Sequence, residues 1–367
     1  MVWGREDLID PSARKSRIER VRSMLHGFDV EGILFFEKAN IHYLTGFTGS
    51  DSALFVGEDS TVLLIDGRYV TQARSEATGC NILQFSNRTE TMAAIISDLS
   101  LNRVGVESPA ISLSNYLELQ DRLEDVSLRP LSGEIERIRI IKDRAEVSLL
   151  REAAIIAARA LEETLEQIRP GISESAIAGI LETKMREAGG EKTSFETIVA
   201  SGANSALPHA VPGPREIQEG DFLTIDYGTV RMGYHSDETC TFAIRSITEK
   251  QSSVYALVKD AHDKALSAVR PGMSCKAIDG VARKVIDDGG YGQFFSHGTG
   301  HGVGLNVHEP PRLSERASDV LEEGMVFTIE PGIYIPGLWG VRIEDTVMVK
   351  QDGYEILTKM SKDLRIL

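Results

Sequence analysis

The sequence predicts two domains, an α/β domain followed by an α+β domain with an internal pseudo-twofold repeat. Three observations support this prediction. Short apolar strands alternate with helical stretches in the first third of the chain, a ten-residue phrase occurs twice in the remainder, and Arg169-Pro170-Gly171 recurs 101 residues later as Arg270-Pro271-Gly272. We therefore expect the domains to cover residues 1–131 and 132–367, and the second domain to consist of two related halves.

The first domain is expected to begin with an amphipathic helix over residues 13–28. Apolar runs flanked by polar turns then predict strands at 33–36, 53–56, 62–65, 81–83 and 104–106. The predicted helices between them begin near residue 68 and cover 90–98 and 114–123. Alternation of this kind is typical of a compact α/β unit.

Each half of the second domain is expected to contain two helices joined by a Pro-Gly turn and followed by an acidic hairpin. The first helix is predicted over residues 143–168, which are rich in Ala, Leu and Glu. Ser173 and Ser274 follow the two Pro-Gly turns and are well placed to cap the next helix of each half. A repeat of about 100 residues is typical of a duplicated half-domain, because solenoid units are much shorter.

The repeated phrase places an acid at the end of a strand in both halves. Residues 219–228 and 323–332 share the pattern Glu-Gly, three residues, Thr-Ile, acid, one residue, Gly. Alternate residues of a strand share a face, so Thr224 and Asp226 are expected to point away from the side that the apolar Leu223 occupies. The strand therefore presents its acid on the polar face.

A second acid follows each copy, so each half is predicted to form a hairpin with one acid on each strand. These acids open the triplets Asp237-Glu238-Thr239 and Glu344-Asp345-Thr346. Ionised carboxylates are seldom buried unless they are paired or hold a metal, and the alternative is that the acids lie at exposed strand ends. A matched pair of pairs in a repeat favours a metal site, in which the pseudo-twofold brings together Asp226, Asp237, Glu330 and Glu344.

Only the second half carries a histidine-rich segment, at residues 296–311. It contains His297, His301 and His308, and its glycines match neither a dinucleotide-binding nor a Walker loop. Four carboxylates and one imidazole can hold two divalent ions, which points to metal-assisted hydrolysis. A donor set with many oxygens and one nitrogen favours Mn²⁺, with Co²⁺, Fe²⁺ and Zn²⁺ as alternatives. No Gly-x-Ser-x-Gly occurs and no cysteine lies beside a histidine, so a nucleophilic hydrolase has little support.

Composition limits the possible partners. The chain has 55 acidic against 40 basic residues, a formal net charge of −15, and a calculated pI near 5.1. That balance opposes binding to nucleic acid or to an anionic membrane, both of which need a basic surface. The N-terminus lacks the apolar core of a signal peptide and no run is long enough to span a bilayer, so we expect a cytoplasmic protein. The three cysteines are far apart and are expected to be buried thiols.

The order and spacing of five residues resemble the metal-ligand set of the "pita-bread" metallopeptidases, namely methionine aminopeptidase, aminopeptidase P and prolidase. These residues are Asp226, Asp237, His301, Glu330 and Glu344. The first domain is also similar to the N-terminal domain of aminopeptidase P and prolidase, notably at Asn40-Ile41-His42-Tyr43-Leu44-Thr45-Gly46-Phe47 and Asp66-Gly67-Arg68-Tyr69. Methionine aminopeptidases usually lack that domain, and creatinases lack the complete metal set. The chain departs from the family at Cys240, where many relatives carry arginine.

The resemblance implies how the five ligands divide their work. Asp226 would chelate one metal, His301 and Glu330 would hold the other, and Asp237 and Glu344 would bridge both. Glu330 would also act as the proton shuttle that takes a proton from the attacking water and passes it to the leaving proline nitrogen.

Five further residues have roles that the resemblance implies. His308 and His209 match histidines that contact the substrate and steady the tetrahedral intermediate. His297 matches a histidine that lines the substrate pocket. Arg342 and Tyr334 match groups that orient the ligands around the substrate; the alternatives are a surface ion-pair partner for Arg342 and a core aromatic for Tyr334.

The function expected from these residues is that of a dinuclear-metal Xaa-Pro aminopeptidase, which removes an N-terminal residue that precedes proline. The alternative is prolidase, an Xaa-Pro dipeptidase that shares every catalytic residue. A third hypothesis is a non-catalytic binding protein on the same fold, against which the retention of all five ligands argues. The expected substrates are peptides with proline at the second position. The resemblance also implies a homodimer in which the N-terminal domain of one subunit helps to close the other's site.

Overall fold

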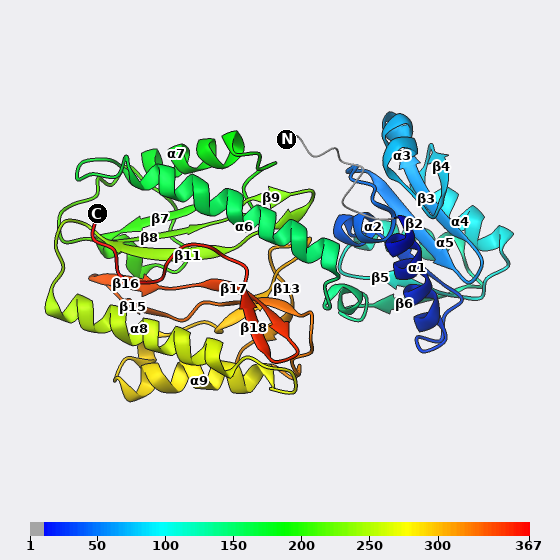
Figure 1. Cartoon of the computed structure of the whole chain (residues 1–367). Helices are drawn as coiled ribbons and strands as arrows, with labels where there is room; N and C mark the ends of the chain where they lie inside the picture. Colours follow the sequence, from blue (N-terminus) through cyan, green and yellow to red (C-terminus); the bar gives the residue numbers. More distant parts are fainter. Residues whose placement is uncertain (1–10) are drawn as a thin grey trace. The chain divides into compact units, whose positions relative to one another are not determined.

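The computed structural model describes residues 11–367 and separates the chain into two compact units (Figure 1). The first unit ends at Arg139 and the second begins at Ile140. The division lies a few residues beyond the expected boundary at residue 131. Within the described part of the chain, no helix is both long enough and apolar enough to cross a membrane.

The first unit is a six-stranded mixed sheet with helices on both faces, which confirms the predicted α/β class. The strand order is β4-β3-β2-β1-β5-β6. The strands are β1 (Gly32–Phe35), β2 (Ser52–Gly57), β3 (Thr61–Asp66), β4 (Asn81–Phe85), β5 (Arg103–Glu107) and β6 (Ser127–Leu131). The helices are α1 (Pro11–Leu25), α2 (Lys38–Thr45), α3 (Val70–Glu76), α4 (Arg88–Asp98) and α5 (Leu113–Arg122).

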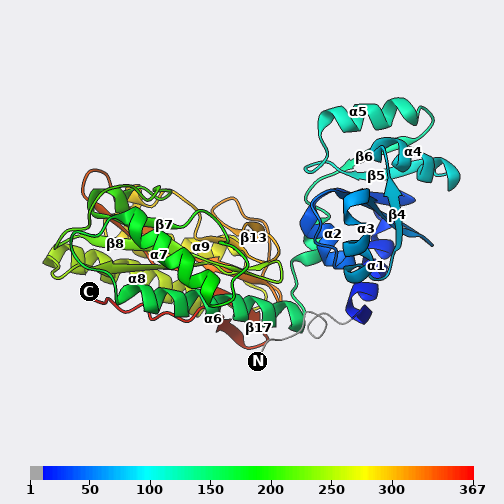
Figure 2. The ribbon, with the colours of Figure 1, turned by 90° about the horizontal axis from the view of Figure 1, so that it is seen from above.

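The two faces of this sheet have separate helical covers. Leu34, Phe55 and Leu64 belong to one apolar cluster with residues of α4 and α5. Helices α1, α2 and α3 contact the strands from the other side, and Figure 2 shows the sheet between the two groups. The sequence reading missed α2 and β6. Helix α2 is short and ends at Gly46, which has φ 83°, and β6 carries Pro130 in an edge strand, where neither apolar run nor alternation is strong.

The second unit consists of two related halves, as the repeat predicted. The first half contains α6 (Arg144–Leu165), α7 (Glu174–Glu187), β7 (Ile198–Ser201), β8 (Phe222–Tyr227), β9 (Val230–Arg231), β10 (Tyr234–His235) and β11 (Glu238–Ala243). The second contains α8 (Glu249–Ala268), α9 (Cys275–Asp288), β12 (Gly300–Gly302), β13 (Glu309–Leu313), β14 (Val326–Ile329), β15 (Gly332–Ile335), β16 (Trp339–Arg342), β17 (Asp345–Lys350) and β18 (Gly353–Ile356).

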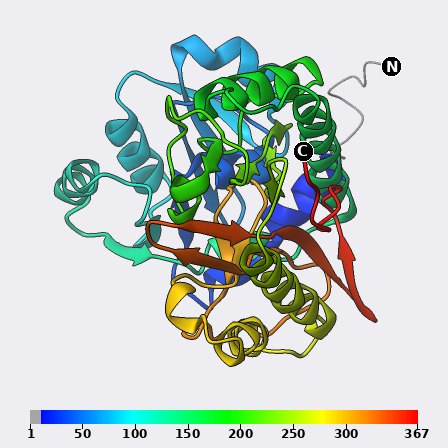
Figure 3. The same ribbon diagram turned by 90° about the vertical axis from the view of Figure 1, so that its left-hand side faces the viewer.

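Helices enclose the strands of this unit from two sides. The sheets have the orders β11-β8-β7 and β13-β12-β14-β17-β18. Figure 1 shows α6 and α7 on one side of the strands and α8 and α9 on the other, and the view in Figure 3 shows the strands between these green and yellow helices. Ser173 and Ser274 cap α7 and α9 by accepting from the backbone N–H groups of Ala176 and Ala277, as predicted.

Each acidic hairpin is more elaborate than the sequence indicated. Strand β8 pairs antiparallel with β11, and β14 pairs with β17 in the same way. A second small hairpin lies between the members of each pair, formed by β9 and β10 in the first half and by β15 and β16 in the second. The later acid of each half, Asp237 or Glu344, therefore lies immediately before the returning strand. Leu223 is buried in an apolar cluster and Asp226 faces the opposite side, as predicted.

Candidate active site

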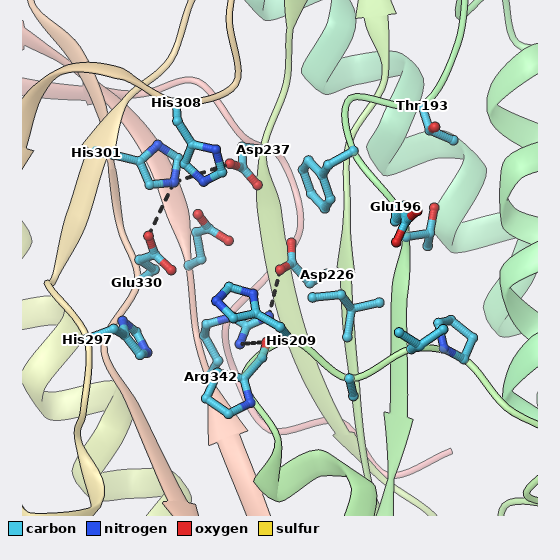
Figure 4. A pocket seen from close by; sticks show the side chains of 18 of the residues that line it. Thr193, Glu196, His209, Asp226, Asp237, His297, His301, His308, Glu330 and Arg342 are labelled. Carbon is cyan, nitrogen blue, oxygen red and sulfur yellow. Dashed lines mark hydrogen bonds and ion pairs between the residues drawn. The ribbon is translucent and has the colours of Figure 1, made fainter.

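The four acids and His301 line one cavity of about 1010 Å³ in the second unit. Possible ligand atoms of Asp237, His301 and Glu344 lie within 4.8 Å of one another. Figure 4 shows three of these acids, Asp226, Asp237 and Glu330, around the cavity. Thr193 and Glu196 lie on the wall opposite His301 and Glu330. The two halves of the repeat thus contribute to a single site.

Asp226 stands at the end of β8 and is held by one guanidinium. Arg342 Nη2 donates to Asp226 Oδ2 at 2.6 Å. The other oxygen, Oδ1, is buried and has no hydrogen-bond partner among the described residues. A buried carboxylate oxygen without a partner is costly. Asp226 therefore presents a free acceptor to the cavity.

Asp237 and Glu344 are fixed by a reciprocal pair of threonines. Thr239 Oγ1 donates to Glu344 Oε2 at 2.6 Å, and Thr346 Oγ1 donates to the backbone carbonyl of Asp237 at 2.7 Å. Each threonine is the last residue of one acidic triplet and contacts the acid of the other triplet. These two hydrogen bonds thus connect the two halves of the repeat next to the acids.

His301 presents a free nitrogen to two carboxylates. Its Nδ1 lies 3.1 Å from the carbonyl oxygen of Gly302 and donates to it, which leaves the lone pair of Nε2 facing the cavity. That Nε2 lies 3.4 Å from Glu330 Oε1 and 3.7 Å from Asp237 Oδ2. Thr328 Oγ1 accepts from the backbone N–H of His301 and donates to Glu330 Oε1, so one hydroxyl orients both ligands.

The site concentrates negative charge that the side chains alone do not balance. Burial raises the pKa of Glu330 to about 8, and the nearby carboxylate of Asp226 adds to the rise. Burial and the neighbouring acids also raise the pKa of Asp237 and of Glu344 well above their usual ranges. Burial lowers the pKa of His301 to about 4, so the imidazole is neutral and available as a ligand.

These residues fit a pair of divalent cations. The cavity offers an unpartnered oxygen of Asp226, a neutral nitrogen of His301 with its lone pair directed inward, and three further carboxylates. Two of these are buried and that of Glu330 is partly buried, and a cation would relieve their mutual repulsion. Carboxylates can bridge two ions, and the mainly oxygen donor set suits hard or borderline divalent metals.

Three of the other predicted residues also line the cavity, namely His209, His297 and His308. His209 and His308 are exposed, and the ring of His308 lies 4.2 Å from that of His301 between centroids. The imidazole Nε2 of His297 lies 2.8 Å from the Tyr334 hydroxyl.

Arg342 lines the cavity and also braces its floor. Its guanidinium donates to the Tyr334 hydroxyl and to the carbonyl oxygen of Pro208, the residue before His209. Tyr334 itself is 6% exposed and is not among the described residues that line the cavity. Tyr334 therefore lies behind the pocket, where its hydroxyl connects Arg342 to His297.

Sequence reasoning missed several residues of the site. Thr239 and Thr346 could have been noticed because each closes an acidic triplet. Arg312 also lines the cavity, opposite His301 in the pairing of β12 and β13. Its side chain is exposed and takes part in none of the hydrogen bonds or ion pairs found among the described residues. Its only signal in the sequence was its position four residues after His308.

Comparison with known proteins identifies the family. Residues 148–351 match metallopeptidase family M24, and residues 17–141 match the creatinase/prolidase N-terminal domain. The chain belongs to metallopeptidase family M24. It is therefore a metallo-exopeptidase with the pita-bread fold, which confirms the predicted family, fold and enzyme class.

Individual relatives extend over nearly the whole chain. An Xaa-Pro dipeptidase of Pyrococcus horikoshii is 36% identical over 351 residues, which cover 94% of this chain and 98% of the relative. The structure of an Xaa-Pro dipeptidase from Bacillus anthracis has a TM-score of 0.94 at 38% identity and covers 96% of this chain and all of that one. The X-Pro aminopeptidase structure from Thermotoga maritima has a TM-score of 0.88 at 35% identity, with coverage of 96% and 100%.

Proposed function

We propose that this protein is a dinuclear-metal Xaa-Pro dipeptidase. The main observation behind the proposal is that four carboxylates and a neutral histidine line one cavity. The same cavity also contains the guanidinium of Arg312, which has no side-chain hydrogen bond or ion pair among the described residues. Several relatives are named Xaa-Pro dipeptidase, so the comparisons favour the alternative that the sequence left open over the aminopeptidase that it placed first. Retention of all five ligands supports an enzyme over a binding protein.

The metal ligands in this proposal are the five that the resemblance implied. Asp226 would hold one ion, His301 and Glu330 the other, and Asp237 and Glu344 both. Two such metal ions, when bound, would act as Lewis acids that activate water and the peptide carbonyl. We assign Mn²⁺ as the native metal on the basis of the oxygen-rich donor set.

Glu330 is the proposed carrier of the proton. Its carboxylate takes the proton of the attacking water and delivers it to the nitrogen of the leaving proline. The buried position of Glu330 and the neighbouring acid Asp226 both favour the protonated form, which suits a group that must hold a proton between two steps. Thr328 fixes its orientation through Oε1.

The histidines stabilise the reacting carbonyl in the proposed mechanism. His209 and His308 lie at the exposed side of the cavity, where an imidazole N–H can donate to the developing oxyanion. His297 is neutral because burial lowers its pKa to about 4, although the hydrogen bond from its Nδ1 to the carbonyl oxygen of Gly298 opposes this shift. Its Nε2 contacts the Tyr334 hydroxyl, which connects it to Arg342 behind the cavity.

Arg312 is the proposed site for the free carboxylate of an Xaa-Pro dipeptide. Two guanidiniums line the cavity, and that of Arg342 is occupied by Asp226. Arg312 is exposed and can form a charge-assisted bidentate pair with a carboxylate. A dipeptide places its carboxylate directly on the proline, whereas in a longer peptide that position is an amide.

An Xaa-Pro aminopeptidase is the second candidate, and the size of the cavity favours it. A neighbouring cavity of about 630 Å³ shares Gly179, Glu182 and Thr193 with the one that holds the acids. Together they offer space along α7 beyond what a dipeptide needs. The aminopeptidase name of the Thermotoga maritima relative is consistent with this use.

Hydrolysis of Ala-Pro, Ala-Pro-Ala and Ala-Ala-Ala by metal-stripped protein, with and without Mn²⁺, tests the proposal. We expect metal-dependent cleavage of Ala-Pro in preference to Ala-Pro-Ala and no cleavage of Ala-Ala-Ala. Preference for the tripeptide would identify the aminopeptidase instead. Failure to cleave all three, with metal bound, would leave the binding-protein hypothesis. Parallel additions of Co²⁺, Fe²⁺ and Zn²⁺ test the metal assignment.

An Arg312→Met variant tests the carboxylate site, with Arg316→Met as the matched control. Arg316 is exposed on the same segment and lies outside the residues described as lining the cavity. We expect Arg312→Met to raise KM for Ala-Pro strongly, to leave Ala-Pro-amide unaffected, and to differ from the control. Equal effects on both substrates would show that Arg312 does not recognise the carboxylate.

We also propose that the protein is a homodimer. The proposal rests on the resemblance in the first unit. Sedimentation equilibrium tests it directly: a mass of twice 40.3 kDa is expected, and a monomer at all concentrations would contradict it.

A further inference from the structure

The second acid of each triplet points away from the cavity. Glu238 follows Asp237 and Asp345 follows Glu344, and successive residues of a strand face opposite sides. Both side chains are buried, at 1% and 5% exposure, and neither is among the described residues that line the cavity. The proposed mechanism gives them no role.

One lysine from the C-terminal segment connects these two acids. Lys362 Nζ lies 2.5 Å from Glu238 Oε1 and 3.4 Å from Asp345 Oδ1, and its side chain is 6% exposed. Cys240 Sγ lies 3.5 Å from the same nitrogen. Burial would lower the pKa of Lys362, but Cys240, Glu238 and Asp345 outweigh burial and raise it well above its usual value, so the ammonium is charged. Lys362 thus forms a bridge between the two halves of the repeat.

Both acids have further polar contacts besides Lys362. Glu238 accepts from the Tyr227 hydroxyl at 2.8 Å and from the backbone N–H of Met360 at 2.9 Å. Asp345 accepts from the Thr358 hydroxyl, and His262 Nε2 lies 3.2 Å from its other oxygen. A buried ion pair contributes little net stability over apolar packing, and in some proteins it specifies the relative position of the groups it joins. Such a geometric role fits this network.

The C-terminal segment that carries Lys362 is itself anchored to both halves. The backbone N–H of Leu357 donates to the carbonyl of Thr346, which lies in β17 of the second half. Farther on, Leu367 donates to the carbonyl of Ala243, and Ile366 bridges to β11 of the first half. Figure 1 shows this red segment running from β18 back along β11. Lys362 lies between the two anchors.

We propose that Lys362 is a positioning residue that fixes the separation of Asp237 and Glu344 from behind the sheet, and thereby sets the metal affinity of the site. Each of these proposed bridging ligands is covalently adjacent to one acid of the pair that Lys362 holds together. This inference rests on the proposed function for the identity of the metal ligands. It assigns a role to the C-terminal segment, which contributes no residue to the cavity.

Whether loss of Lys362 weakens or strengthens metal binding distinguishes a positioning role from a purely electrostatic one. Removal of the lysine leaves Glu238 and Asp345 with no ammonium between them, and so makes the rear of the site more negative. Through-space attraction alone would then strengthen the binding of a divalent cation. Loss of positioning has the opposite effect, because the two bridging carboxylates are no longer held at one separation.

Titration of the metal-free chain with Mn²⁺ alone, followed by calorimetry, tests the proposal. We expect Lys362→Met to weaken Mn²⁺ binding by about 10- to 100-fold, the range for residues that orient metal ligands. Lys359→Met is the matched control, since Lys359 is an exposed lysine of the same segment, and its affinity should equal that of the unaltered chain. Unchanged or tighter binding by folded Lys362→Met would overturn the proposal.

A second variant covers the case in which Lys362→Met does not fold. The triple variant Glu238→Gln, Asp345→Asn, Lys362→Met removes the two carboxylates and the ammonium together, and the same weakening of Mn²⁺ binding is expected. Affinity equal to that of the unaltered chain would contradict the positioning role. If the unaltered chain binds no Mn²⁺, the proposed metal site itself fails, which is a separate outcome from a variant that differs from a binding parent.

Discussion

The side chain of Glu330 has two proposed roles, metal ligand and proton carrier, which require different protonation states. A metal ligand must be available as a carboxylate, whereas a proton carrier must accept a proton readily. Burial and the nearby Asp226 raise the pKa of Glu330, while Arg342 opposes that rise. The guanidinium of Arg342, which lines the cavity and donates to Asp226, therefore balances part of the charge.

Replacement of Glu330 by glutamine tests its proposed role as proton carrier. The amide keeps an oxygen for the metal but cannot accept and release the proton, so kcat for Ala-Pro should fall by about 100- to 10,000-fold. Glu323→Gln is the matched control, since Glu323 is an exposed acid of the same repeated phrase, and its kcat should be unchanged. Steady-state kinetics with excess Mn²⁺ provide the measurement; an active Glu330→Gln enzyme would exclude the role.

At the scale of the element, strand β12 depends on a glycine for its close approach to β14. A Cβ built on Gly300 would lie 1.9 Å from the carbonyl oxygen of Thr328. No side chain fits in that space, so the strand that carries His301 can lie this close to the one that leads to Glu330 only because residue 300 is glycine. The distance between two proposed ligands is thereby set by the backbone.

Gly300→Ala should therefore displace His301 and weaken metal binding. The matched control is Gly280→Ala on α9, where an added Cβ would meet nothing within 4 Å. The control should stabilise the protein by about 0.5–1 kcal/mol, because glycine is unfavourable within a helix. Calorimetric Mn²⁺ titration and thermal unfolding distinguish the two. Metal binding by Gly300→Ala with unaltered affinity would show that the strand adjusts without cost.

Helix α8 contributes a pH-dependent contact to the strand behind the site. Burial would lower the pKa of His262, but its contacts with Asp263 at 3.0 Å and Asp345 at 3.2 Å outweigh burial and raise that pKa above 6.5. A raised folded-state pKa stabilises the native state fully below pH 6.5 and loses this contribution as pH rises through the folded value. The free energy of unfolding should therefore fall as the pH rises from 6.5 through the folded-state pKa of His262.

The His262→Gln variant should lack this part of the pH dependence. Thermal unfolding in the presence of a chelator, at intervals between about pH 5 and 9, measures the effect for both proteins. The difference in melting temperature between the two should be largest at low pH and should shrink as pH rises. A constant difference over the whole interval would show that His262 stabilises the fold without titrating.

At the scale of the whole molecule, the repeat explains which parts of the site the sequence could predict. Asp226, Glu330 and their partner acids could be predicted because the same sequence pattern occurs twice. The pseudo-twofold that brings them together follows from this repeat without information about side-chain packing. Arg312 and Lys362 have no counterpart in the repeat. Their roles depend on which segments lie side by side, and Lys362 meets Glu238 across 124 positions of sequence. Local pattern carries no information about such contacts.

The division into two units predicts that the second can fold and bind metal alone. All five proposed ligands and two apolar clusters, one around α8 and α9 and the other around α6 and α7, lie within residues 140–367. A fragment with its own core should fold cooperatively. The fragment 140–367 should therefore bind Mn²⁺ with the stoichiometry of the full chain, whereas 1–139 should bind none. Circular dichroism and calorimetric titration of both fragments supply the measurement. A fragment that is unfolded, or that folds but binds no metal, would show that the second unit needs the first.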